Sequence, residues 1–173
     1  MICLYRGRRG TGKTLTMVKD VLLYTQNKWN VISNIHLAEQ IPHQVLSRQE
    51  IIELLHSDLR DYVLVLDEIQ TIIDSRRSMK KDNMDFSYFI QQIRKKNIIL
   101  LATTQYTRTV DIRFREHVDI LVSPKFIQKY PIVEVEYMDL TTQEDLGYIQ
   151  TKNIVYDPKP IFALYDTTEI QTL

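Results

Sequence analysis

The placement of glycine is the feature that most constrains how this chain can fold. The 173 residues contain four glycines, and three of them lie in the segment GRRGTGKT at residues 7–14. Average proteins contain about 7% glycine, so these few are expected where the backbone needs conformations that other residues avoid. Apolar residues 2–5 predict a buried strand before the segment, and periodic apolar residues in 13–26 predict a helix after it.

The segment matches the pattern G-x-x-x-x-G-K-[ST] of phosphate-binding loops. In such a loop, backbone N–H groups point inward at phosphate oxygens, and the following helix adds its partial positive charge. We expect Lys13 to contact the β- and γ-phosphates and Thr14 to bind Mg²⁺. The alternative is a chance match, against which the flanking strand and helix argue. The expected nucleotide-binding residues are Gly7, Arg8, Arg9, Gly10, Thr11, Gly12, Lys13 and Thr14.

A second candidate catalytic segment is YVLVLDE, in which five apolar residues precede Asp67 and Glu68. A continuous apolar run is typical of a parallel strand covered on both faces. Asp67 would then hold Mg²⁺ close to the phosphates, and Glu68 would polarise an attacking water. A further apolar run ends at Gln105, which is expected to contact the water or the γ-phosphate; the alternative is a solvent-facing glutamine.

The order of these segments predicts an α/β fold with a mostly parallel sheet and helices on both faces. Strands are expected at 2–5, 30–35, 61–66, 97–105 and 118–122, and helices at 13–26, from Ser47 onward and at 86–97.

Alternating residues in 130–140 and 147–157 predict antiparallel strands, such as a hairpin at the sheet edge, and 161–170 is expected to be one more strand or a docking tail. We therefore divide the chain into a core at 1–123 and a β-rich extension of the same domain at 124–173.

Overall charge is uninformative, because 22 basic residues balance 22 acidic ones. The longest apolar runs have five residues, whereas a membrane span needs about 20. We therefore expect a soluble, intracellular chain without a membrane span.

Four segments together resemble the HerA–FtsK superfamily of DNA- and polymer-translocating ATPases: GRRGTGKTLTMVKDVLL, VISNIHL, VLVLDEIQTIIDSR and IRKKNIILLATTQYTRTVDIRFR. Within it, the chain is most similar to genome-packaging ATPases of icosahedral viruses and to zonular occludens toxin-like assembly ATPases of filamentous phages. The likeness covers residues 1–122. The filamentous-phage type carries a membrane span and a further domain that this chain lacks, so the chain is either of the packaging type or truncated.

The resemblance implies a RecA-like P-loop ATPase that uses ATP and Mg²⁺ and works as a homo-oligomeric ring, usually a hexamer. It also implies an arginine supplied by the neighbouring subunit to the γ-phosphate. Arg94 is the first candidate, and Arg113 and Arg115 are the second; the alternative for each is a solvated basic side chain.

Residues 75–97 contain seven basic and two acidic side chains. A basic loop there would contact DNA phosphates in the channel of a ring; the alternative is a solvated loop, or one that pairs with a neighbouring subunit. The DNA-binding candidates are Arg76, Arg77, Lys80 and Lys81.

The function expected first is a Mg²⁺-dependent ATPase motor that moves double-stranded DNA into a viral capsid. It would act with a capsid or portal (vertex) protein, in the cytoplasm of the infected host cell and transiently at the virion vertex. One alternative is an ATPase that drives assembly and extrusion of filamentous virions. Another is a nucleotide-switched module that binds DNA or a capsid protein without sustained turnover.

Overall fold

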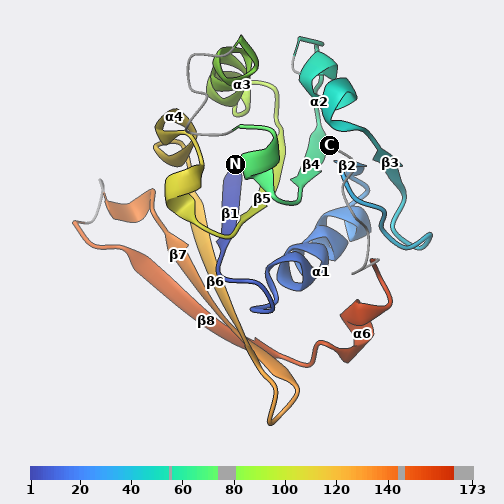
Figure 1. Ribbon diagram of the computed structural model, residues 1–173, viewed down its shortest axis with the longest axis vertical. Helices are drawn as coiled ribbons and strands as arrows, with labels where there is room; N and C mark the ends of the chain where they lie inside the picture. The colour runs from blue at the N-terminus through green and yellow to red at the C-terminus, as the bar shows by residue number, and fades with distance from the viewer. Residues whose placement is uncertain (55, 74–80, 144–146, 166–173) are drawn as a thin grey trace.

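One eight-stranded sheet runs through the molecule in the order β3-β2-β4-β5-β1-β6-β7-β8 (Figure 1). The computed structural model describes the chain except residues 55, 74–80, 144–146 and 166–173 and the side chains of 81–83. The strands are β1 (Ile2–Arg6), β2 (Asn30–Ser33), β3 (His43–Val45), β4 (Tyr62–Leu66), β5 (Ile99–Thr104), β6 (Ile120–Ile127), β7 (Ile132–Asp139) and β8 (Gln150–Tyr156). The described helices are α1 (Lys13–Gln26), α2 (Arg48–Leu54), α3 (Lys81–Gln92), α4 (Ile112–Arg115) and α6 (Lys159–Phe162), with 3-10 turns η1 (Ile69–Thr71) and η3 (Thr107–Thr109).

The strands from β3 to β6 are parallel, and β7 and β8 are added antiparallel to them. Alternate residues of β1 enter two separate apolar cores. Ile2 and Leu4 pack with residues of α2, α3 and α4, whereas Cys3 and Tyr5 pack with residues of α1 and α6. Because both faces of the central strands are buried, their sequences are continuous apolar runs. The expected α/β fold with a mostly parallel sheet and antiparallel C-terminal strands is confirmed.

The C-terminal extension continues the sheet through β6. Residues 120–122 of this strand pair with β1, and the whole strand pairs with β7. Residues 161–170 were expected to form a strand or a docking tail. The described part begins with the short helix α6, which Pro158 and Pro160 favour by fixing φ at helical values. The chain then docks on the core: the Ala38 N–H donates to the Leu164 carbonyl at 2.8 Å, and Tyr165 forms an isolated antiparallel β-bridge with Leu37.

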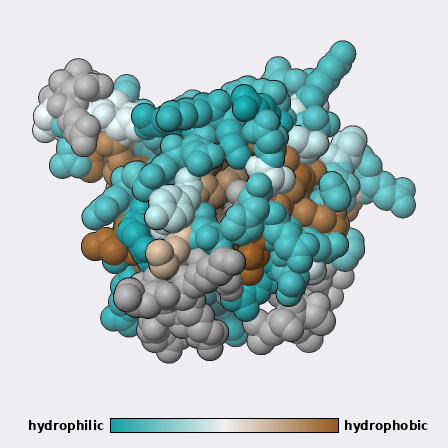
Figure 2. Space-filling model, turned by 90° about the horizontal axis from the view of Figure 1, so that it is seen from above, coloured by the Kyte–Doolittle hydropathy of each residue, from teal (hydrophilic) through white to brown (hydrophobic). Residues whose placement is uncertain are grey.

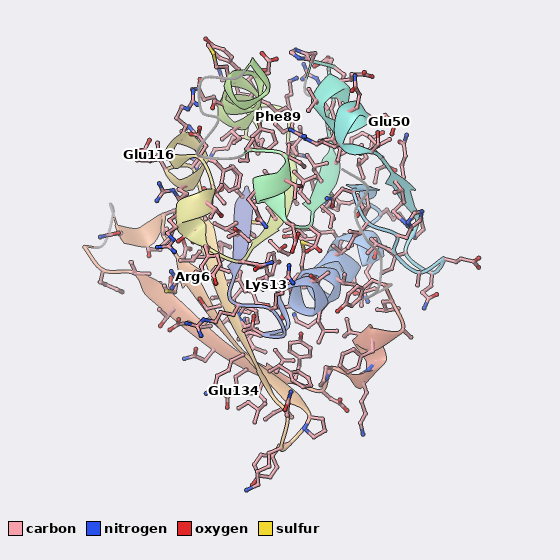
Figure 3. The ribbon with its side chains drawn as sticks, in the orientation of Figure 1. Arg6, Lys13, Glu50, Phe89, Glu116 and Glu134 are labelled. Atoms are coloured by element: carbon pink, nitrogen blue, oxygen red, sulfur yellow. The ribbon has the colours of Figure 1, made fainter. Side chains whose placement is uncertain are left out.

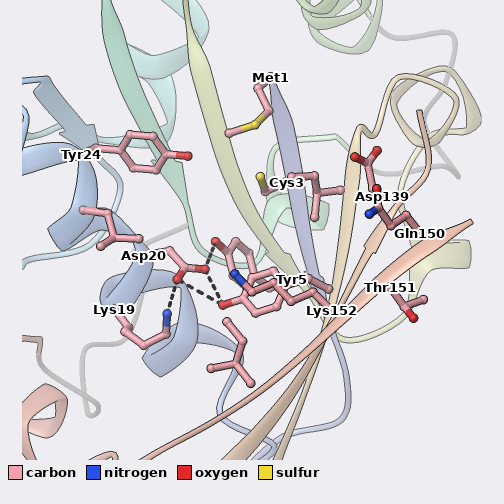
Figure 4. Close-up of a pocket in the computed structure, with 14 residues that line it drawn as sticks. Met1, Cys3, Tyr5, Lys19, Asp20, Tyr24, Asp139, Gln150, Thr151 and Lys152 are labelled. Carbon is pink, nitrogen blue, oxygen red and sulfur yellow. Dashed lines mark hydrogen bonds and ion pairs between the residues drawn. The ribbon is translucent and has the colours of Figure 1, made fainter. Parts of the chain in front are cut away.

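A buried carboxylate ties the extension to α1 (Figure 4). Asp20 accepts hydrogen bonds from the Tyr5 hydroxyl at 2.8 Å and the Tyr137 hydroxyl at 3.0 Å, and it pairs with Lys19. Burial and the Asp20 charge raise the pKa of both tyrosines, so both hydroxyls stay protonated as donors. These residues line a cavity of about 470 Å³ between α1 and the strands β6 to β8. The contacts hold α1 and the extension as one unit.

Two local expectations had different outcomes. The helix expected from Ser47 is capped as predicted: the Ser47 N–H donates to Glu50 Oε2 at 2.7 Å, and the Glu50 N–H donates to Ser47 Oγ at 3.3 Å. The helix expected at 86–97 is α3, which instead begins at Lys81 and ends at Gln92. Within the described parts of the chain, none of the helices has the length and hydropathy of a membrane span.

Candidate nucleotide-binding site

The loop at residues 7–14 leaves the carboxyl end of β1, where Arg6 lies, and runs into α1, which begins at Lys13 (Figure 3). Two of its glycines are needed for different reasons. A Cβ on Gly7 would lie 2.6 Å from Thr11 Oγ1 and would displace that side chain, and the φ of Gly7 is +150°, which side chains rarely adopt. Gly12 caps α1 with φ 90°, in the left-handed region that side chains disfavour. The scarce glycines therefore stand where the loop geometry requires them.

Lys13 lies over this loop. Lys13 is only 9% exposed, and its Nζ donates to the Arg8 carbonyl at 3.1 Å. Burial lowers the pKa of the Lys13 ammonium, while the nearby carboxylates of Asp67 and Glu68 act in the opposite direction. The lysine expected to contact the phosphates is thus held beside both candidate catalytic carboxylates.

Asp67 follows β4 and meets Thr14 at the start of α1. The Thr14 hydroxyl donates to Asp67 Oδ1 at 2.9 Å, so the two expected Mg²⁺ ligands lie side by side. Burial raises the pKa of Asp67, and the hydrogen bonds from Thr103 and Thr14 act against this shift. Mg²⁺ is usually bound by one or two carboxylates together with substrate phosphates and waters. The carboxylate and hydroxyl oxygens here fit that ligand set.

Two site residues were missed by sequence reasoning. The Asn34 side chain, at the end of β2, accepts from the Asp67 N–H at 2.7 Å and donates to the Asp67 carbonyl at 2.9 Å. The Thr103 hydroxyl, on β5, donates to Asp67 Oδ1 at 2.6 Å. Both are polar residues at the carboxyl ends of parallel strands, where ligands bind in open α/β sheets. That position was the signal that could have identified them.

Glu68 and Gln105 are brought together across the ends of β4 and β5. Gln105 Nε2 donates to Glu68 Oε1 at 3.0 Å, and the Glu68 N–H donates to the Thr103 hydroxyl at 2.9 Å. Glu68 has φ 50° and ψ 56°, a left-handed conformation that costs a non-glycine residue about 1–2 kcal/mol. This backbone turn directs the carboxylate toward Gln105 and away from the path of the strand.

The first arginine candidate lies at the other edge of the sheet. Arg94 precedes β5 and is therefore at the amino end of the strands, whereas the phosphate-binding loop follows the carboxyl end of β1. Its side chain is 77% exposed, and Nη2 donates to Asp119 Oδ1 at 2.6 Å. Asp119 Oδ2 in turn accepts from the Ile2 N–H at 2.7 Å. Arg94 therefore cannot reach the site of its own chain, and its action on a neighbouring subunit stays a prediction.

The other basic candidates lie at several places. Arg115 lines, together with Arg94, a groove of about 570 Å³ at the amino edge of the sheet. The face of the molecule seen from above is largely hydrophilic, with several hydrophobic patches (Figure 2). The Arg113 guanidinium donates to the Asp111 carboxylate at 2.8 and 3.0 Å, and the Arg113 N–H donates to it at 2.9 Å. Lys81 begins α3, and its side chain is outside the described part. The other DNA-binding candidates, Arg76, Arg77 and Lys80, lie outside the described residues.

The parallel sheet, the loop after β1 and the acidic pair after β4 define a P-loop nucleoside triphosphatase. Residues 2–124 match the sequence model of the ATPase family associated with various cellular activities (AAA), and the chain belongs to this family. Membership implies ATP hydrolysis; proteins of this family generally bind ATP with Mg²⁺ and often oligomerise.

Many solved structures share the fold, and three of them are compared below. The N-terminal domain of zonular occludens toxin from Neisseria meningitidis has a TM-score of 0.64 at 20% identity, covering 95% of this chain and 98% of that one. The genome packaging NTPase B204 from Sulfolobus turreted icosahedral virus 2, in complex with ATP-γS, has a TM-score of 0.63 at 13% identity, covering 87% and 95%. The flagellar accessory protein FlaH from Methanocaldococcus jannaschii has a TM-score of 0.56 at 14% identity, covering 90% and 84%. No curated protein sequence matches the chain.

Proposed function

We propose that this ATPase is a motor that translocates double-stranded DNA into a viral capsid. The observation that carries the catalytic part is the hydrogen-bonded row from Thr14 through Asp67 and Thr103 to Glu68 and Gln105. The packaging part is supported by the sequence resemblance and by the fold shared with a viral genome packaging NTPase.

The row suggests a division of roles. The loop N–H groups and the Lys13 ammonium would bind the triphosphate, and Thr14 and Asp67 would hold Mg²⁺, which neutralises charge on the phosphates. Glu68 would take up the proton of the attacking water. Gln105, already hydrogen-bonded to Glu68, would orient that water and respond when the γ-phosphate leaves. Asn34 holds the backbone of Asp67 and is therefore a positioning residue.

We also propose that the subunits form a ring, most simply a hexamer, in which Arg94 of one subunit reaches the γ-phosphate bound by its neighbour. In support, the exposed Arg94 and Arg115 line one groove at the edge of the sheet opposite the chain's own site. Two subunits stacked edge to edge would bring this groove to the neighbour's loop. The motor would act in the host cytoplasm and at the virion vertex, against a capsid or portal protein.

A second candidate function is the assembly and extrusion of filamentous virions. It is favoured by the likeness to the zonular occludens toxin domain, which extends over 95% of this chain, including the C-terminal extension. A longer natural gene product with a membrane span would support it over packaging.

Steady-state hydrolysis with Mg²⁺ and duplex DNA tests the motor. We expect turnover that duplex DNA increases, and that the Lys13→Ala variant lacks. Turnover no higher than that of Lys13→Ala would leave a nucleotide-switched binding module instead. Turnover without a DNA effect would favour the virion-assembly function. A second assay measures whether the protein displaces a third strand bound to the duplex. Displacement would show translocation, whereas stimulated hydrolysis without displacement would show that DNA only activates the ATPase.

A further inference from the structure

A basic cavity of about 400 Å³ lies beside the phosphate-binding loop, on the side where Gln105 ends β5. Three arginines contribute to it: Arg6 from β1, Arg8 from the loop and Arg108 from η3. Its other lining residues are Gly7, Gln105, Tyr106, Thr107, Ser123 and Pro124. Among these described lining residues there is no Asp or Glu, so the cavity is suited to an anion.

The three arginines keep donor groups available. Arg6 donates through Nε to Ser123 Oγ at 3.1 Å, which fixes its side chain and leaves both terminal nitrogens without a hydrogen-bond partner among the described residues. Arg108 stacks its guanidinium on the Tyr106 ring, 5.6 Å from the ring centre. A stacked guanidinium still presents its N–H groups in its own plane. Within the described part, none of the three forms an ion pair with a carboxylate.

The turn that carries Tyr106 and Arg108 is held by its own hydrogen bonds. The Tyr106 carbonyl accepts from the Thr104 hydroxyl at 3.2 Å, the Thr109 hydroxyl at 2.7 Å and the Thr109 N–H at 3.0 Å. Val110, directly after the turn, is fully buried and anchors it. The Tyr106 side chain is nevertheless 48% exposed. An exposed aromatic ring and an arginine are therefore presented on a preformed turn.

We propose that this cavity binds the phosphodiester backbone of the DNA that the motor moves, an inference that rests on the proposed function. Arginine N–H groups match phosphate oxygens in pairs, and an exposed tyrosine beside them suits a sugar or base better than it suits an acidic peptide. The cavity adjoins the nucleotide site, since Gly7 and Arg8 of the loop line it, and it extends from there to Tyr106 and Arg108. Because Gln105 also lines it, the backbone phosphate would bind next to the residue that contacts Glu68.

Titration of a fluorescently labelled duplex, by anisotropy and without nucleotide, tests this inference. We expect Arg108→Ala to weaken duplex binding about tenfold and to reduce the slope of log K against log salt by about 0.9, the value for one phosphate contact. The matched control is Arg60→Ala. Arg60 is 60% exposed, pairs with Asp58, and lies before β4 at the opposite edge of the sheet. This control should leave affinity and slope unchanged.

The outcomes separate the cavity from the motor. If the wild-type chain binds duplex and Arg108→Ala behaves like Arg60→Ala, the cavity is not the DNA site, while the DNA motor stands. If the wild-type chain hydrolyses ATP but binds no duplex at low salt, both the cavity and the DNA cargo are wrong. Displacement of the duplex by ATP-γS would place the phosphate in the loop at 7–14 instead. Equal competition by poly-glutamate of matched charge would make the site one for acidic protein.

Discussion

Replacing Thr103 by valine tests whether one buried hydroxyl organises the catalytic row. Thr103 is fully buried, and its hydroxyl donates to Asp67 Oδ1 at 2.6 Å and accepts from the Glu68 N–H at 2.9 Å. Valine keeps the shape and the β-branching of threonine but removes both bonds. A hydrogen bond to a charged group contributes roughly 1.5–3 kcal/mol, and an unsatisfied buried N–H costs about 1–3 kcal/mol. We expect a loss of about 3 kcal/mol, or about 6–12 °C in Tm for a chain of this size.

The neighbouring residue supplies the control. Thr104 is equally buried, but its hydroxyl makes one hydrogen bond, to the Tyr106 carbonyl. Thr104→Val should therefore lower Tm by only about 2–4 °C, and Thr103→Ser should restore both lost bonds. The Thr103 bond also opposes the rise in the pKa of Asp67, so Thr103→Val should raise the Mg²⁺ concentration needed for half-maximal hydrolysis, most at low pH. If Thr103→Val and Thr104→Val have the same Tm and need the same Mg²⁺ concentration for half-maximal hydrolysis, the Thr103 hydroxyl does not organise the site.

Three further predictions concern the same site. Burial raises the pKa of Asp67 above 3.8, so the nucleotide-free protein loses stability as the pH rises from 3.8 through the pKa of Asp67 in the folded state. Urea unfolding between about pH 4 and 7 should show that Asp67→Asn lacks this loss. The same variant should have no hydrolysis. Gly12→Ala should bind ATP more weakly in calorimetry, because the φ of Gly12 is 90°, in the left-handed region. The control is Gly147→Ala: Gly147 has φ 73° and open space around it, so this variant should bear similar backbone strain and still bind ATP. Arg94→Ala should abolish hydrolysis but not ATP binding, and mixing it with Glu68→Ala subunits should restore some activity; no recovery in mixtures shown to co-assemble would argue against Arg94 acting in trans.

The parts of the fold that are specified locally could be predicted from the sequence. The strand, loop and helix around residues 7–14 follow from glycine positions and apolar periodicity, and the capping box at Ser47 needs only four consecutive residues. The strand β3 could not be predicted, because His43–Val45 is short, lacks an apolar pattern and exists through parallel pairing with β2. Helix α6 was also missed, although Pro158 and Pro160 at its start are a local signal for the first turn of a helix.

The site itself was predictable only where a motif named the residue. Asn34 and Thr103 reach Asp67 across 33 and 36 positions of sequence, and these contacts depend on the register between β2, β4 and β5. The position of Arg94 could have been predicted. A helix that precedes a parallel strand ends at the amino edge of the sheet, so Arg94 had to lie opposite a loop that follows the carboxyl end of β1.

The C-terminal extension lies mostly beyond the part that matches the AAA family, at 2–124, yet its contacts converge on the phosphate-binding helix. Val133 Cγ1 lies 3.6 Å from where a Cβ on Gly12 would stand, the Tyr156 hydroxyl is 3.0 Å from the Thr16 hydroxyl, and Tyr137 donates to Asp20. All three contacts fall on the cap or the first turns of α1, whose N–H groups would bind phosphate. A shift of the β7–β8 hairpin would therefore move those N–H groups directly, which makes the extension part of the ATPase rather than an appendage to it.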